Sequence, residues 1–293
     1  MQILLAPGGL LGQLPFPRPG AEIRLTLGRG VSAGDMGLFI ADEFEFTTPP
    51  ASFAIRARAA MFDGTKGGRE ALQSAKRRSW PAGTTIGDMV ATVAADHGLR
   101  ALTGPSVASV ALDHINQLDE SDLNLLLRIA RDNDAFVKPG NGSIIVAKKG
   151  ESVSASGAAL PVVTLSPGDL TSCTLRRSSR ETPKSCIASW RDVAAAITRE
   201  EKAGSGTPEL RLRQHFGSAA AAQKAAQAAL DRGKRGEKTL SVSLPGRIDI
   251  MAESRIIMPP LQPDLAGEWL VTRVQHNLSA GSGWAMSIEA EQV

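Results

Sequence analysis

Hydrophobic and polar residues alternate along the first sixty residues, which is the pattern of strands that bury one face. Residues 22–27 alternate aliphatic side chains with charged or hydroxyl side chains, and residues 36–46 and 52–60 continue the pattern. Pro49-Pro50 separates the last two segments, as proline commonly does between strands. We therefore predict an antiparallel meander of three strands.

A glycine-containing stretch inside this meander, Gly28-x-Gly30-x-x-Ala33, has the form of a dinucleotide-binding fingerprint. The fingerprint requires a helix directly after it, because the amino end of that helix holds the pyrophosphate. The pattern of another strand follows instead. We interpret the stretch as the loop of a hairpin.

The periodicity becomes helical after residue 80. Apolar residues recur every three or four positions between residues 84 and 97, with Thr84 or Thr85 as the N-cap and Gly98 as the terminator. The pattern predicts a helix at the start of a second domain.

A second helix, followed by a hairpin, is predicted between residues 118 and 146. Asp119 and Ser121 are suited to accept hydrogen bonds from the amides of a first helical turn. The expected apolar stripe is Leu123, Leu126, Leu127 and Ala130, and the expected solvent face is Arg128, Arg131 and Asp132. Asn141-Gly142 supplies the tight turn between two short strands.

The remaining chain predicts more strands and one alanine-rich helix. Strands are expected at 162–165, 171–178 and 185–191, and a flexible loop at 204–208. The helix is expected from Ser218, its N-cap, to Leu230, with its end near Gly233.

The last sixty residues repeat the pattern of the first sixty. Residues 255–258, 267–274 and 285–291 correspond in order to residues 24–27, 37–44 and 52–58. Alternation alone produces much of this match, so two unrelated amphipathic hairpins remain an alternative. If the repeat is real, the fold is α+β, with two antiparallel β-barrel-like units at residues 1–65 and 161–293. A helix-containing α/β domain at residues 66–160 is inserted between them.

Composition agrees with a folded protein that does not enter a membrane. The chain has 293 residues, of which 42% are hydrophobic, enough for a full core in two or three domains. No apolar run is long enough to span a bilayer, and no basic segment precedes the apolar residues of the first fourteen. We expect synthesis in the cytoplasm without membrane insertion. Cys173 and Cys186 lack the spacing of a metal site, which favours free buried thiols.

The charge pattern gives little support to nucleic-acid binding. The formal net charge is only +3, and the densest basic cluster is residues 66–78. Such a cluster can hold phosphates, but no aromatic residues are interleaved for base stacking and no helix-turn-helix pattern occurs. A solvated or subunit-contacting loop is the favoured interpretation.

The best local set of groups for hydrolysis is Asp113-His114 near Asp119 and Glu120. Cell-wall hydrolases need paired carboxylates or a metal-held water. Helix capping accounts for the acids without chemistry, and His97 and His215 have no visible partners. We therefore predict no catalytic residues, no metal site and no cofactor.

Three segments resemble the phage late control D protein family, and together they span most of the chain. They are Trp80 with the following 84–88 (TTIGD), then 117–126 (QLDESDLNLL), and 267–276 (GEWLVTRVQH). Members of this family are baseplate hub proteins of contractile phage tails, and their relatives form the hub part of the type VI secretion spike. The resemblance implies a structural ring that joins the tail tube to the central spike.

The resemblance also implies partners and a location. It implies a homotrimer, in which two similar units per chain give six units around the ring. Further expected partners are the tail spike protein, the tail tube or tube-initiating protein and the baseplate wedge proteins, with DNA only as cargo in the channel. The protein would assemble in the host cytoplasm and end in the virion tail baseplate, or in an equivalent injection particle. A hub-associated cell-wall hydrolase, or a nucleic-acid-binding late-gene regulator, remains the alternative.

One departure from the family concerns the start of the chain. Family members usually have further strands before the segment that matches residues 16–23, so we expect an incomplete first unit with an exposed strand edge. Residues 3–5 are apolar enough to add as a strand, and another chain is the alternative occupant. The second unit, residues 160–293, is expected to close better and to be the more stable half.

Overall fold

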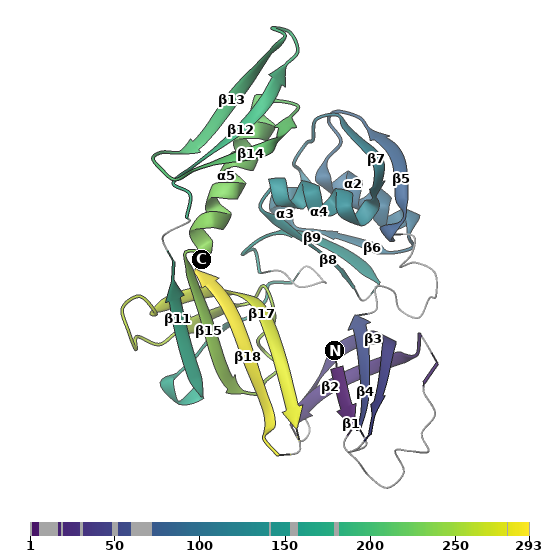
Figure 1. The fold of residues 1–293 in the computed structure, drawn as a ribbon, viewed down its shortest axis with the longest axis vertical. Coiled ribbons are helices and arrows are strands. Elements are labelled where there is room, and N and C mark those ends of the chain that lie inside the picture. Colours follow the sequence, from purple (N-terminus) through teal and green to yellow (C-terminus); the bar gives the residue numbers. More distant parts are fainter. Residues whose placement is uncertain are drawn as a thin grey trace.

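A computed structural model describes most of the chain. The described ranges are residues 2–5, 17–18, 20–29, 32–48, 52–59, 72–140, 142–152, 158–178, 182–279 and 281–292. They form a strand-rich α+β protein with five sheets (Figure 1), so the predicted class is confirmed. The prediction for Pro49-Pro50 and the basic residues Lys66 and Arg69 lie outside the described residues.

The N-terminal sheet contains the predicted meander. Its strands are β1 (Gln2–Leu5), β2 (Glu22–Arg29), β3 (Ser32–Thr47) and β4 (Ser52–Ala59), in the antiparallel order β1-β4-β3-β2. Arg29 lies opposite Ser32, so β2 and β3 form a hairpin where the dinucleotide fingerprint would need a helix. The apolar residues 3–5 do add as a strand, and they pair with β4 of the same chain.

Residues 72–148, the inserted region, combine two small sheets with helices. It contains a pair of antiparallel strands, β5 (Ala75–Trp80) and β7 (Ile115–Ser121), and the three-stranded sheet β6-β9-β8. Helices are drawn between the two in Figure 1. The elements of the three-stranded sheet and the helices packed on it are β6 (Arg100–Thr103), β8 (Ala135–Gly140), β9 (Ser143–Lys148), α2 (Ile86–Asp96), α3 (Pro105–Ala108) and α4 (Asp122–Asp132). Strands β8 and β9 form the predicted hairpin, with Gly142 at φ +67° in its turn.

Helix α2 matches its prediction closely. Thr85 is the N-cap, because its hydroxyl accepts a hydrogen bond from the Asp88 amide at 3.1 Å. Gly98 follows the helix with φ +65°, a conformation that glycine adopts without strain. The face that carries Met89, Val90 and Val93 is buried in the core of the inserted region.

Helix α4 begins later than predicted and turns a different face inward. Residues 115–121 form strand β7, so Asp119 lies in a strand and Ser121 alone is the N-cap. The buried face is Leu125, Leu126, Ile129 and Ala130, whereas the predicted stripe residue Leu127 is 42% exposed. The predicted stripe is confirmed for Leu126 and Ala130 and wrong for Leu127. Leucine occupies 123 and 125–127, and such a run leaves the helical phase undetermined.

The C-terminal sheet is six-stranded and open. Its strands are β10 (Val162–Thr164), β11 (Ser172–Arg177), β15 (Lys238–Pro245), β16 (Arg255–Met258), β17 (Gly267–Ser279) and β18 (Gly283–Gln292), in the order β10-β16-β17-β18-β15-β11. A short 3-10 helix, η2 (Pro167–Asp169), joins β10 to β11. One face holds a core around the fully buried Trp269. Neither this sheet nor the N-terminal sheet closes into a barrel within the described residues.

A further sheet, backed by a helix, lies between β11 and β15 in the sequence. Its strands β12 (Ser185–Asp192), β13 (Ile197–Gly204) and β14 (Glu209–Phe216) take the order β13-β12-β14, and α5 (Ala219–Arg235) covers one face (Figure 1). Strands β13 and β14 were not predicted, and the predicted loop at 204–208 is the connection between them. Small side chains on α5 allow close packing on Cys186 and Ala188.

Helix α5 starts as predicted and ends later. The Ser218 hydroxyl accepts a hydrogen bond from the Ala221 amide at 3.2 Å and caps the helix. Gly233 is not the terminator, because the helix continues to Arg235 and ends at Gly236. A Cβ atom at Gly233 would lie 2.8 Å from the Pro183 ring. Gly233 therefore permits a close approach to the neighbouring chain segment.

Candidate functional site

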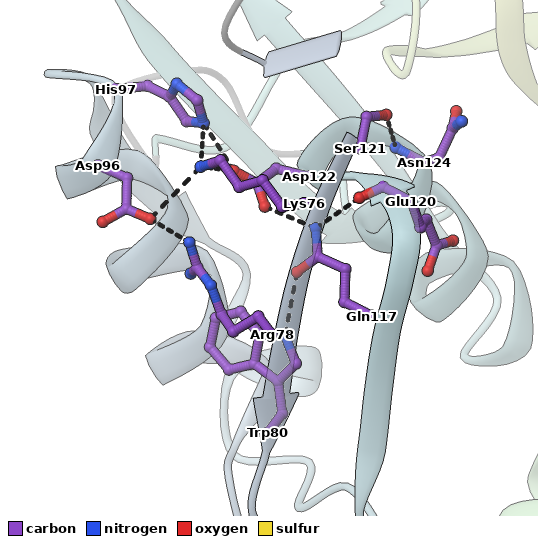
Figure 2. Close-up of polar contacts among 10 residues, drawn as sticks. All are labelled: Lys76, Arg78, Trp80, Asp96, His97, Gln117, Glu120, Ser121, Asp122 and Asn124. Atoms are coloured by element: carbon purple, nitrogen blue, oxygen red, sulfur yellow. Dashed lines mark hydrogen bonds and ion pairs between the residues drawn. The ribbon is translucent and has the colours of Figure 1, made fainter. Parts of the chain in front are cut away.

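The family-like segment at 117–126 surrounds a buried polar centre in the inserted region (Figure 2). The Asp122 carboxylate is fully buried at the start of α4. Its Oδ2 lies 2.5 Å from Lys76 Nζ and 2.7 Å from His97 Nε2. A carboxylate only accepts, so His97 donates from Nε2 and holds its proton there. Three elements, β5, α2 and α4, thus meet at one charged group.

Gln117 extends this centre to the tryptophan of the first family-like segment. Its side-chain amide donates to Asp122 Oδ1 at 2.8 Å and to the Glu120 carbonyl at 2.9 Å. Its carbonyl oxygen accepts from Trp80 Nε1 at 3.4 Å. Gln117 itself is fully buried, so each of these bonds satisfies a polar group that water cannot reach.

The surroundings of Asp122 keep it ionised. Burial by itself raises the pKa of Asp122, but the hydrogen bonds from Lys76, Gln117 and His97 together outweigh it and hold the pKa below its usual value. Lys76 stays partly in contact with water, with 29% of its side chain exposed. The arrangement stabilises the junction of strands and helices.

The described end of the basic cluster, residues 75–78, lies in strand β5, and its three cations are paired with carboxylates. Lys76 binds Asp122, Arg77 binds Asp119 at 2.8 Å, and Arg78 binds Asp96. Arg78 also lies over the Trp80 ring, 4.9 Å from its centroid. These contacts favour a structural interpretation over phosphate binding.

Of the groups considered for hydrolysis, Asp113, His114 and His215 line one cavity, whereas Asp119 and Glu120 do not. Asp113 accepts a hydrogen bond from Ser218 at 2.8 Å, whereas His114 lies 3.1 Å from Asn116. Both line a cavity of about 510 Å³ between α4, β14 and the start of α5. Asp119 pairs with Arg77, and Glu120 binds Arg128 at 2.8 Å. Neither acid lines this cavity, although Arg128 does.

The two cysteines also lie in structural positions. Cys173 is half-buried, Cys186 is buried, and both are free thiols whose pKa values are raised by burial. Within the described ranges, no three His, Cys, Asp or Glu side chains gather in a group that could hold a metal ion. No helix in the described part of the chain is long and apolar enough to cross a membrane.

An arginine joins three parts of the chain that are distant in sequence. Arg235, at the end of α5, donates two hydrogen bonds to Asp134 of the inserted region, one of them at 2.9 Å. It also binds Glu291 on β18 at 3.2 Å. The Arg235 and Asp134 side chains are 16% and 9% exposed, so this contact is shielded from solvent.

The N-terminal and C-terminal sheets each have a bulge, and the two bulges lie at positions that the sequence repeat aligns. A bulge in β3 separates the pairs Ala41–Ala57 and Glu43–Arg56. A bulge in β17 separates the pairs Val271–Ala290 and Arg273–Glu289. The two pairs in one sheet correspond to the two pairs in the other when residues 267–274 are aligned with 37–44 and residues 285–291 with 52–58. This alignment needs no gap. A bulge occupies one defined place in a strand, so simple alternation does not account for this agreement.

An ion pair crosses each bulge, with the charges exchanged. In the N-terminal sheet the acid Glu43 lies on β3 and pairs with Arg56 on β4. In the C-terminal sheet the base Arg273 lies on β17 and pairs with Glu289 on β18 at 3.4 Å. Both sheets therefore have an ion pair at the bulge, but the strands that carry the acid and the base are exchanged.

The predicted correspondence between residues 255–258, in β16, and residues 24–27, in β2, is wrong by two residues. Arg24 lies opposite Leu38, whereas Arg255 lies opposite Leu270, the counterpart of Ile40. A shift of two keeps each side chain on its face of the sheet, which is why alternation alone did not reveal it.

Comparison with known proteins identifies the class. The profile of the phage tail baseplate hub (GPD) family matches residues 71–282. A probable baseplate hub protein of Escherichia phage 186 is 30% identical, over 96% of this chain and 81% of the relative. The chain belongs to the phage tail baseplate hub family, as its resemblance to the late control D proteins implied.

Solved structures support the same fold. A tail protein of Neisseria meningitidis MC58 aligns with a TM-score of 0.66 at 13% identity, covering 88% of this chain and 80% of that one. The Escherichia coli c3393 protein, a component of the type VI secretion system, aligns with a TM-score of 0.55 at 9% identity, covering 91% and 62%. These structures share the architecture, and their low identity limits the likeness to the fold.

Proposed function

We propose that this hub protein forms a homotrimeric ring that joins the tail tube to the central spike. The observation that carries the proposal is the shared bulge with its reversed ion pair. It supports two related units in one chain, in residues 1–65 and 161–293, with residues 66–160 inserted between them. Three chains then supply six similar units, which suits a ring between a sixfold tube and a threefold spike.

Among the described residues, the N-terminal sheet has fewer strands than the C-terminal sheet, and β1 and β2 form its two edges. Strands β2, β3, β4 and β1 hold the places of β16, β17, β18 and β15, while β10 and β11 have no counterparts among the described residues. The unpaired backbone groups of β1 and β2 favour the addition of a strand from another chain. This supports barrel-like units that are completed on assembly, and a second unit more stable than the first.

The partners follow from this place in the particle. We propose contacts with the tail spike protein, with the tail tube or tube-initiating protein and with baseplate wedge proteins, and DNA passing only as cargo. The ring assembles in the host cytoplasm before it joins the tail. The same role in a type VI-like injection machine fits the fold equally well.

We propose no catalytic role for this chain. The strongest acid and base groups are engaged in separate structural contacts, and Asp122 is shielded and held by three donors. A cell-wall hydrolase remains the competing function. Peptidoglycan turnover that is lost in Glu120→Gln would overturn this part of the proposal.

The decisive experiment is the native mass of the purified chain, alone and mixed with its spike protein. The expected result is a trimer, alone or on binding the trimeric spike. A monodisperse monomer at high concentration, in the presence of the spike as well, would refute the ring.

A further inference from the structure

The two related sheets touch inside one chain through the end of the β2–β3 hairpin. Gly34 on β3 lies opposite Leu27, near this end. A Cβ atom at Gly34 would lie 3.2 Å from Cδ1 of Ile248, in the connection between β15 and β16. The first unit therefore meets the second through its first hairpin (Figure 1).

The same place in the C-terminal meander is held by the loop of residues 259–266. Strand β16 ends at Met258, opposite Gly267. In the N-terminal meander, Leu25 lies opposite the aligned Gly37, and the hairpin continues beyond this pair to Arg29. The 259–266 loop thus replaces the part of the hairpin that makes the contact between units.

The 259–266 loop is ordered from within. Leu265 is 5% exposed and belongs to the core, and its carbonyl accepts from Trp269 Nε1 at 2.8 Å. Its amide donates to the Gln262 carbonyl at 3.0 Å. Asp264 pairs with Lys238 of β15 at 2.9 Å. Little conformational freedom is left for this loop to lose on binding.

The outer part of the loop is apolar. Leu261 is 54% exposed, and its amide donates to the Pro259 carbonyl at 2.8 Å, which fixes the backbone beside it. The following turn is restricted by Pro263. A leucine held outward on an ordered loop presents apolar surface that a second protein can cover.

We propose that the 259–266 loop packs on the N-terminal sheet unit of a neighbouring copy of this chain, with Leu261 buried in the contact. The inference rests on the proposed ring. Six alternating units have two kinds of junction, one within each chain and one between chains. Similar units in similar positions are expected to contact their neighbours through the same part of their structure. The β2–β3 hairpin makes this contact within a chain, so we expect the 259–266 loop to make it between chains.

The test compares two exposed apolar sites, Leu261 and Val193, by native mass. Leu261→Asp places a charge in the proposed contact, whereas Val193→Asp places one at an 83% exposed position after β12, outside it. We expect Val193→Asp to assemble like the wild type and Leu261→Asp to associate at least about tenfold more weakly. Thermal unfolding of the isolated Leu261→Asp chain should match the wild type.

The possible outcomes distinguish a failure of the proposed loop contact from a failure of the proposed ring. If the wild type stays monomeric with and without the spike, the ring and the inference both fail. If Leu261→Asp assembles as the wild type does, the inference fails and the ring stands. If Leu261→Asp forms the trimer but no longer binds the spike, the loop belongs to the spike contact and the inference is wrong. Leu261→Ser, with no charge, keeps the test valid if the aspartate variant unfolds.

Discussion

Replacing Asp122 by asparagine tests whether the buried polar centre stabilises the fold. The change keeps the side-chain shape and removes the charge that faces Lys76 and His97. Breaking a fully buried ion pair by removing one partner costs about 3–5 kcal/mol. Lys76 is 29% exposed, so water stabilises part of its remaining charge. We therefore expect Asp122→Asn to lower the free energy of unfolding by about 2–3 kcal/mol.

Asp119→Asn is the matched control, since it makes the same chemical change three residues away. The Asp119 side chain is 68% exposed, and so is most of its partner Arg77. An exposed ion pair contributes little to stability. Asparagine also tolerates the backbone of this position, which has φ +52°. The control should unfold like the wild type within experimental error.

Urea unfolding at neutral pH, followed by tryptophan fluorescence, measures both variants. Trp80 is one of four tryptophans in the chain and donates to Gln117 at the edge of the centre, so the emission includes a contribution from this region. Equal loss in the two variants, or a loss below about 0.5 kcal/mol in Asp122→Asn, would refute the account of the centre as a stabilising junction.

The pH dependence gives a second reading of the same group. Asp122 has a lower pKa in the folded chain than in the unfolded chain, where the pKa of an aspartate is about 4. Its ionisation therefore stabilises the fold above that pH, and this stabilisation is lost as the pH falls through the folded-state pKa. The difference between the wild type and Asp122→Asn should be full at neutral pH and should shrink in acid.

Three further predictions concern other parts of the chain. Arg235→Ala should lower the free energy of unfolding by about 2–4 kcal/mol in urea, because it leaves nearly buried carboxylates without their cation. A loss of free energy smaller than that caused by replacing an exposed arginine would contradict the interpretation that this contact is shielded from solvent. Gly233→Ala should lower the free energy of unfolding by about 1–3 kcal/mol, measured by thermal unfolding, because its methyl group would lie 2.8 Å from the Pro183 ring. An unchanged stability would show that helix α5 shifts locally to accommodate the methyl group. Hydrogen exchange in the isolated monomer should be faster at residues 22–27 than at 269–274, and equal protection would argue against an incomplete first unit.

Local signals predicted the elements whose ends are set by neighbouring residues. Helix α2 carries its cap, its apolar face and its terminator within fourteen residues, so the sequence was sufficient. Helix α4 begins later than predicted because pairing between β5 and β7 extends the strand through Asp119 and Glu120. That pairing joins segments about forty residues apart, and no local spacing contains it.

The buried polar centre was missed for the same reason. Lys76 and His97 come from different elements, 46 and 25 residues before Asp122. The sequence places no partner near His97, and helix capping is sufficient to account for the acids of this segment. The available signal was Gln117 beside apolar residues in a family-like segment, since a buried amide needs several partners. Strands β13 and β14 were missed because they are mostly exposed and charged, which hides the alternation of a one-sided strand.

The reversed ion pairs at the two bulges limit how the sheets can be recombined. A chimera that carries the β18 sequence in place of β4 alone would set a glutamate opposite Glu43, and like charges directly opposite each other destabilise a sheet. Grafting β17 and β18 together would bring a matched acid and base. The two strands are therefore a single unit of exchange, and natural or engineered hybrids of these hubs should retain them as a pair.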